Sequence, residues 1–261
     1  MSTKPAVAIV PGAFYERWHY RLLHDGLEKA GYKVTTIALP STGNEKPTKD
    51  LYPDLDTASS AIKSYIDQDL NVVVVMHSYG GLVGSCASKG LLPADQPNGK
   101  GVVGLVYLCA GVPMEGYSFI QGVGGQHFPW MTLINAEDPS AEAIPNTGIW
   151  IWPTGNGTDP GQLFFQDCDA ATREEAVKRL GYWSEGCMWT PATFTAWQEI
   201  ESNYLITLED VGLPAEQQEM MTQIPGGKWK RVEKIATGHS PFLSKPDETV
   251  AFVRQCCGEE V

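Results

Sequence analysis

The sequence is poor in positive charge. Of its 261 residues, 19 are lysine or arginine and 31 are aspartate or glutamate, which gives a formal net charge of −12. Proteins that bind nucleic acid rely on basic surfaces to neutralise phosphates. The composition therefore argues against a nucleic-acid partner, and it disfavours polyanionic substrates for the same electrostatic reason.

Long hydrophobic runs are also missing. No stretch approaches the roughly 18 apolar residues that a membrane-spanning helix needs, and the apolar segment before Pro11 is too short for the core of a signal peptide. The six cysteines lack metal-site spacing, so we interpret them as reduced packing residues. We expect a cytoplasmic protein that does not associate with membranes. No metal, nucleotide or flavin motif is found, so no metal and no cofactor are predicted.

What the chain does contain is an alternation of strand-like and helix-like segments. Its length and 43% hydrophobic content suit one domain, residues 1–261, with an insertion. Alternating strands and helices predict an α/β fold with a mostly parallel, doubly wound sheet of about six strands, flanked by helices. The predicted strands are 7–10, 33–39, 72–76, 102–109, 204–207 and 230–235, and the predicted helices are 18–30, 55–66, 79–89, one after Pro214, and 245–256.

The periodicity fails between about residues 112 and 197, where glycine, proline and aromatic residues dominate and only residues 170–180 resemble a helix. We interpret this region as an inserted cap. Its large aromatic side chains would either build a small core of the cap or line an apolar substrate pocket. The candidates for the pocket are Phe14, Phe128, Trp130, Trp152, Phe164 and Trp183.

Residues 72–81, VVVVMHSYGG, run an apolar strand directly into a serine and two glycines. This pattern is typical of a nucleophile elbow, a strained turn that exposes a serine above the sheet. Gly80 fits the motif, whereas Met76 stands where a small residue is usual. The alternative is an ordinary loop after a strand, so the assignment of Ser78 as nucleophile depends on its partners.

A serine nucleophile needs a histidine base, and the base needs a carboxylate. His239 is the one histidine that follows the last predicted strand, which is where the base of such a fold is found. Glu209 and Asp210 follow the preceding strand, and we prefer Asp210 as the acid. Asp167 and Asp169 are competitors within the cap.

The oxyanion of an acyl-transfer reaction requires backbone N–H donors. In a nucleophile elbow, one donor comes from the residue after the serine and another from the loop after an early strand. The first position is Tyr79. In the loop after residues 7–10 we prefer Ala13, since Gly12 allows a close turn.

Four segments together resemble the α/β-hydrolase superfamily: residues 11–14 (PGAF), 75–81 (VMHSYGG), 208–214 (LEDVGLP) and 238–246 (GHSPFLSKP). The similarity is greatest to the methylesterase and hydroxynitrile lyase group and its fungal and bacterial relatives. It implies Ser78, Asp210 and His239 as a catalytic triad with Ala13 and Tyr79 as oxyanion donors. Two departures are Pro11 in place of the usual histidine of the oxyanion loop, and Met76.

The favoured function is a serine hydrolase that cleaves a small, partly apolar or aromatic carboxylic ester or lactone through an acyl-enzyme. One alternative is a carbon–carbon lyase on the same triad, of hydroxynitrile lyase or retro-aldol type. Hydroxynitrile lyases in the resembled group carry a threonine and a lysine where this chain has Gly12 and Ser240, which counts against that alternative. The other is a ligand-binding receptor with the hydrolase fold. An apolar cap surface would also allow a homodimer.

Overall fold

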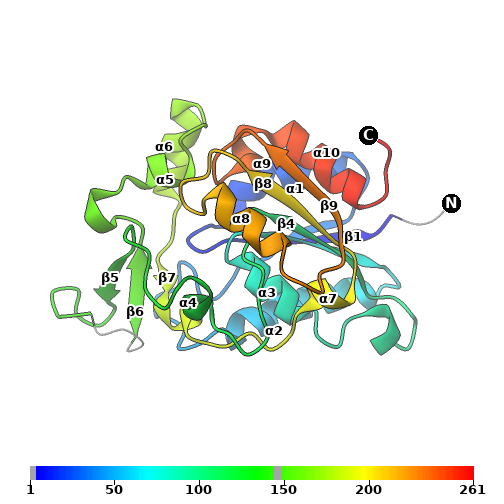
Figure 1. Cartoon of the computed structure of the whole chain (residues 1–261), viewed down its shortest axis with the longest axis horizontal. Helices are drawn as coiled ribbons and strands as arrows, with labels where there is room; N and C mark the ends of the chain where they lie inside the picture. The colour runs from blue at the N-terminus through cyan, green and yellow to red at the C-terminus, as the bar shows by residue number, and fades with distance from the viewer. Residues whose placement is uncertain (1–3, 144–147) are drawn as a thin grey trace.

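The computed structural model describes residues 4–143 and 148–261. Its centre is a six-stranded sheet with strand order β2-β1-β3-β4-β8-β9, in which every neighbouring pair is parallel (Figure 1). The sheet and its flanking helices confirm the predicted fold class. The strands are β1 (Ala6–Val10), β2 (Val34–Thr36), β3 (Val72–His77), β4 (Val102–Leu108), β8 (Ser202–Thr207) and β9 (Trp229–Ile235).

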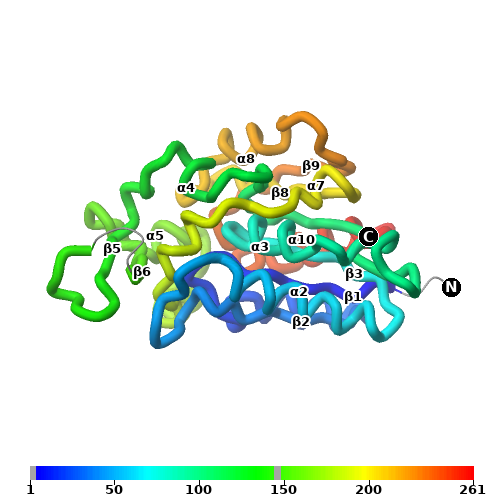
Figure 2. The backbone as a smooth tube through the Cα atoms, turned by 90° about the horizontal axis from the view of Figure 1, so that it is seen from below, coloured from blue at the N-terminus to red at the C-terminus, as the bar shows by residue number. Residues whose placement is uncertain are grey.

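Helices cover both faces of this sheet, as right-handed crossovers between parallel strands require. Helix α1 packs with α9 and α10 on one face, and α2 packs with α3 on the other (Figures 1 and 2). The continuous apolar run of β3 is explained by this arrangement, because a strand covered on both sides has no polar face. The helices are α1 (Arg21–Lys29), α2 (Tyr52–Ile66), α3 (Gly80–Ala87), α8 (Ala215–Thr222), α9 (Pro241–Ser244) and α10 (Pro246–Cys256).

Most of the chain between β4 and β8, from α4 to β7, lies beyond one end of the sheet, whereas the C-terminus lies toward the other end (Figures 1 and 2). The sequence pattern indicated one helix here but missed a small antiparallel sheet of order β5-β6-β7. The elements are α4 (Phe119–Gly122), β5 (Thr132–Asn135), β6 (Ile149–Trp152), α5 (Pro160–Phe164), α6 (Ala170–Lys178), β7 (Trp183–Ser184) and α7 (Ala196–Glu199).

The chain returns to the main sheet close to the predicted end of the cap at residue 197. The indole of Trp197, in α7, stacks on that of Trp229 in β9 with ring centroids 6.1 Å apart. The Ser85 hydroxyl of α3 also accepts a hydrogen bond from the N–H of Ala196. In the described part of the chain, no helix combines the length and apolar character needed to cross a bilayer.

Candidate active site

The turn after β3 presents Ser78 in a strained conformation. Its φ is 52°, in the left-handed region that a residue with a side chain seldom adopts. The two glycines that follow are required by close packing: a Cβ at Gly80 would lie 2.4 Å from the carbonyl oxygen of Val10, and one at Gly81 would lie 2.1 Å from that of Gly111. The segment therefore has the geometry of a nucleophile elbow.

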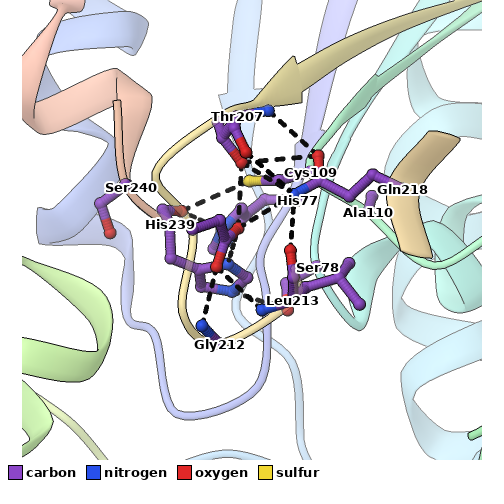
Figure 3. Close-up of polar contacts among 12 residues, drawn as sticks. His77, Ser78, Cys109, Ala110, Thr207, Gly212, Leu213, Gln218, His239 and Ser240 are labelled. Atoms are coloured by element: carbon purple, nitrogen blue, oxygen red, sulfur yellow. Dashed lines mark hydrogen bonds and ion pairs between the residues drawn. The ribbon is translucent and has the colours of Figure 1, made fainter. Parts of the chain in front are cut away.

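Ser78, His239 and Asp210 are joined by hydrogen bonds at this turn (Figure 3). His239 Nδ1 lies 2.7 Å from Asp210 Oδ2, and His239 Nε2 lies 3.0 Å from Ser78 Oγ. Because the carboxylate only accepts, Nδ1 carries the proton and Nε2 accepts from the serine hydroxyl. This tautomer leaves a base directed at the serine proton.

Asp210 is held by several donors. Its Oδ1 accepts from the backbone N–H groups of Gly212 and Leu213, both at 2.8 Å, and the Thr207 hydroxyl donates to its Oδ2 at 3.0 Å (Figure 3). Its alternative, Glu209, is exposed. These bonds, with a further one from Gln218 Nε2 to Oδ2 at 3.3 Å, fix the carboxylate in the orientation that suits His239.

The two aspartates of the cap have other roles. Asp169 caps α6 by accepting from the N–H groups of Ala171 and Thr172. Asp167 accepts from the N–H of Gly238 at 2.9 Å, and its neighbour Gln166 donates to the carbonyl oxygen of Glu209 at 2.6 Å. Adjacent cap residues thus bind both the loop that carries Asp210 and the loop that carries His239.

The loop after β1 lies against the elbow. A Cβ at Gly12 would come within 2.7 Å of His77 Nδ1 and 3.0 Å of Ser78 Cβ, so a larger residue does not fit there without movement. The N–H of Tyr15 donates to the carbonyl oxygen of Gly12 at 3.4 Å. Because the Gly12–Ala13 peptide is trans, the N–H of Ala13 points away from Tyr15.

Among the described residues, neither the N–H of Ala13 nor that of Tyr79 has a hydrogen-bond acceptor. Both residues border the same cavity as Ser78. Two free donors beside a serine are what an oxyanion hole requires. The Tyr79 side chain is directed elsewhere: its hydroxyl donates to Asp54 at 2.8 Å, and burial raises the pKa of that phenol well above its usual value.

The cavity above Ser78 has a volume of about 550 Å³ and an apolar lining. Of the six aromatic residues predicted to line it, Phe14, Phe128, Trp130, Phe164 and Trp183 do so. Trp152 does not, because its indole lies 5.0 Å from the ring of Tyr182 on the same side of β6 as Trp150. Side chains alternate along a strand, so Trp150 and Trp152 share the face of β6 that packs on Tyr182.

Part of the lining lies outside the predicted set. Helix α8 contributes Gln217, Met220 and Met221, and Ile224 follows just after the helix. Its polar sequence, AEQQEMMT, gives little sign of a pocket wall, although its position just after the Asp210 loop was an available signal. None of the described residues that line the cavity is Asp, Glu, Lys or Arg.

His77, Cys109 and His239 bring three possible metal-ligand atoms within 4.8 Å of one another. The ring nitrogens of both histidines already have protein partners. Burial raises the pKa of the Cys109 thiol well above its usual value, which disfavours the thiolate that binds metals. This cluster is therefore poorly suited to a metal ion.

The comparisons with known proteins agree with the fold. The chain is 33% identical to nvfD, an alpha/beta hydrolase of Aspergillus novofumigatus, over 99% of this chain and 98% of that one. It is 27% identical to norfluorocurarine synthase 2 of a Strychnos species, over 92% and 90% of the two chains.

Solved structures with the same fold include those of two esterases. Polyneuridine aldehyde esterase aligns with a TM-score of 0.74 at 20% identity, covering 97% of this chain and 99% of that one. The Arabidopsis methylesterase MES16 aligns with a TM-score of 0.69 at 17% identity, with the same coverage. A family model described as the alpha/beta hydrolase family matches residues 7–252, and the chain belongs to this family.

Proposed function

We propose that this hydrolase is a carboxylic ester hydrolase that cleaves a neutral, apolar ester or lactone. The observation that supports this most strongly is the chain of hydrogen bonds from Asp210 through His239 to Ser78, which ends at a cavity whose described lining residues include no Asp, Glu, Lys or Arg. A buried charge on a substrate would find no partner there, and burying an unpaired charge is costly.

In this proposal Ser78 Oγ attacks the carbonyl carbon while His239 Nε2 takes its proton. Asp210 holds the imidazole tautomer and stabilises the imidazolium, and the N–H groups of Ala13 and Tyr79 stabilise the oxyanion. His239 then gives the proton to the departing alkoxide. A water molecule, deprotonated by His239, hydrolyses the acyl-enzyme and regenerates Ser78.

The first experiment is labelling with a fluorophosphonate probe. We expect the wild type to be labelled on Ser78 and Ser78→Ala to be unlabelled, both being folded by circular dichroism. A folded wild type without labelling would overturn the proposal and favour a receptor that retains the fold.

The second experiment compares substrates of equal size and different charge. The p-nitrophenyl ester of valeric acid is neutral, whereas the mono-p-nitrophenyl ester of glutaric acid carries a carboxylate. We expect kcat/KM to be about 100-fold lower for the anion, on the order of 3 kcal/mol for an unpaired buried charge. Equal kcat/KM values would contradict the preference for neutral substrates that we infer from the cavity lining. A lactone series would distinguish cyclic from open esters.

The lyase alternative is less well supported. The position of the lyase threonine is Gly12, packed against His77, and the position of the lyase lysine is Ser240, whose buried hydroxyl lies 2.9 Å from that of Tyr15. No cation is therefore available at either position to stabilise a departing cyanide. Turnover of mandelonitrile in the absence of any ester hydrolysis would reverse this preference.

A further inference from the structure

A hydrogen-bonded chain behind the candidate site connects the loop after β1 to the loop of His239. The N–H of Gly12 donates to the Tyr20 hydroxyl at 2.8 Å, and this hydroxyl lies 2.8 Å from His77 Nδ1. His77 Nε2 lies 2.9 Å from the carbonyl oxygen of His239. Tyr20 and His77 are both buried, so water does not compete for these bonds.

The direction of each bond follows from the groups involved. A carbonyl oxygen only accepts, so His77 Nε2 carries a proton and donates to His239. Burial lowers the pKa of His77 well below its usual value, with the nearby ring of His239 contributing, so the imidazole is neutral and Nδ1 accepts. Tyr20 therefore accepts from Gly12 and donates to His77.

This chain fixes two peptide planes at the site. One is the Pro11–Gly12 peptide, whose N–H is held by Tyr20; the next is the Gly12–Ala13 peptide, whose carbonyl is held by the N–H of Tyr15. Together they set the direction of the Ala13 N–H. At the other end, the bond to the His239 carbonyl fixes the backbone beneath the imidazole.

We infer that Tyr20 and His77 are positioning residues, which hold the Ala13 oxyanion donor and the His239 base in fixed positions relative to each other through one hydrogen-bonded chain. This inference rests on the proposed function. It assigns roles to two side chains that lie outside the cavity lining, and it explains why the residue before the nucleophile is a histidine rather than another apolar residue of the strand.

The test is Tyr20→Phe, with Tyr32→Phe as the matched control. Tyr32 is also buried and its hydroxyl donates to Glu259, near the C-terminus. A trifluoromethyl ketone that adds to Ser78 forms an oxyanion, whereas the corresponding methyl ketone binds without addition. The ratio of the two affinities therefore reports on the oxyanion donors rather than on stability or pocket shape.

We expect Tyr20→Phe to weaken trifluoromethyl ketone binding about three- to tenfold, the size of one organised hydrogen bond. Methyl ketone binding should change less than twofold, kcat should fall with little change in KM, and Tyr32→Phe should match the wild type. If Tyr20→Phe binds both ketones as the wild type does, or loses both equally, the inference is wrong.

A second pair of variants serves if Tyr20→Phe does not fold. His77→Asn retains an acceptor near Nδ1 for Tyr20, whereas His77→Leu removes it at similar volume. The inference requires His77→Asn to keep more of the trifluoromethyl ketone preference than His77→Leu, and equal losses would contradict it. Fluorophosphonate labelling of the wild type separates failure of this inference from failure of the proposed function. If only the inference fails, Ser78 is still labelled; if the proposed function fails, Ser78 remains unlabelled.

Discussion

The side chain of Met76 occupies the space that Gly84 leaves open on α3. A Cβ atom at Gly84 would lie 2.6 Å from both Cγ and Sδ of Met76. Strand and helix must approach closely at an elbow, which is why a small residue is usual at the position of Met76. In this chain the helix supplies the missing space, so the departure from the motif is compensated one turn into α3.

Gly84→Ala should therefore destabilise the protein, although the same change in an ordinary helix interior stabilises it by about 1 kcal/mol. Overpacking against Met76 costs about 1–3 kcal/mol. Urea denaturation of the wild type, Gly84→Ala, Met76→Ala and the double variant would give the coupling energy. We expect Met76→Ala to relieve the Gly84→Ala penalty, and strictly additive losses would show that the two sites are independent.

Asp210→Asn should lower kcat for ester hydrolysis by about 10⁴-fold, because an amide cannot hold His239 in the required tautomer. Glu209→Gln is the control, since this adjacent carboxylate is exposed, and we expect it to retain wild-type kcat. Both variants are compared with one ester, after thermal melts have shown that they fold. A similar loss in both variants would contradict the assignment of the acid.

Trp130→Ala should raise KM for an aromatic ester, because this indole packs against Phe128 and Phe164 at the cavity wall. Removing such a contact costs about 1–3 kcal/mol of binding, or roughly 5- to 150-fold. Trp152→Ala removes an equally large side chain that packs on Tyr182 and does not line the cavity, and its KM should stay within twofold. A rise in KM for Trp152→Ala, with no rise for Trp130→Ala, would contradict this assignment of the cavity lining.

The free energy of unfolding should fall as the pH drops below about 6.5. Burial lowers the pKa of His19 and, more strongly, that of His77. The unfolded state takes up protons near pH 6.5 while the folded state does not, so the stabilisation is complete above this pH and is lost below it. Each group contributes at most about 1.4 kcal/mol per pH unit.

His19→Gln should make this pH dependence less steep. Denaturant titrations between pH 7.5 and 5 would give the slope for both proteins. A glutamine amide retains a donor for the carbonyl oxygen of Ala176, which His19 Nε2 contacts at 3.0 Å, so the variant is expected to fold. An unchanged slope would mean that His19 is protonated equally in both states.

The parallel core was predictable because its signals are local. Apolar runs such as that of β3 are characteristic of strands buried on both faces, and chain order alone predicted the two loops from which His239 and Asp210 meet beside Ser78. The small sheet of β5, β6 and β7 was not predictable in this way. Its strands are short and it pairs β7 with β6 across 30 intervening residues, so neither local pattern nor turn sequence indicates the pairing.

The cavity lining shows a similar limit. Some aromatic residues of the cap line the cavity and others, such as Trp152 against Tyr182, pack within the cap. Sequence spacing in an irregular region does not define which way each ring faces. The chain through Tyr20 and His77 was hidden for a different reason. A buried histidine before the serine has no distinctive pattern, and its partner lies 57 residues earlier.

The bonds from Gln166 and Asp167 to the loops beneath them have a consequence for how a ligand reaches Ser78. Swinging this part of the cap outward would remove the acceptor of the Gly238 N–H and the donor to the Glu209 carbonyl, and so would loosen the loops of His239 and Asp210 together. Access by hinged opening at α5 and α6 would therefore disturb the hydrogen bonds among Ser78, His239 and Asp210 while exposing them. Entry between α4 and α8, where the exposed methionine Met220 borders the cavity, leaves both loops intact.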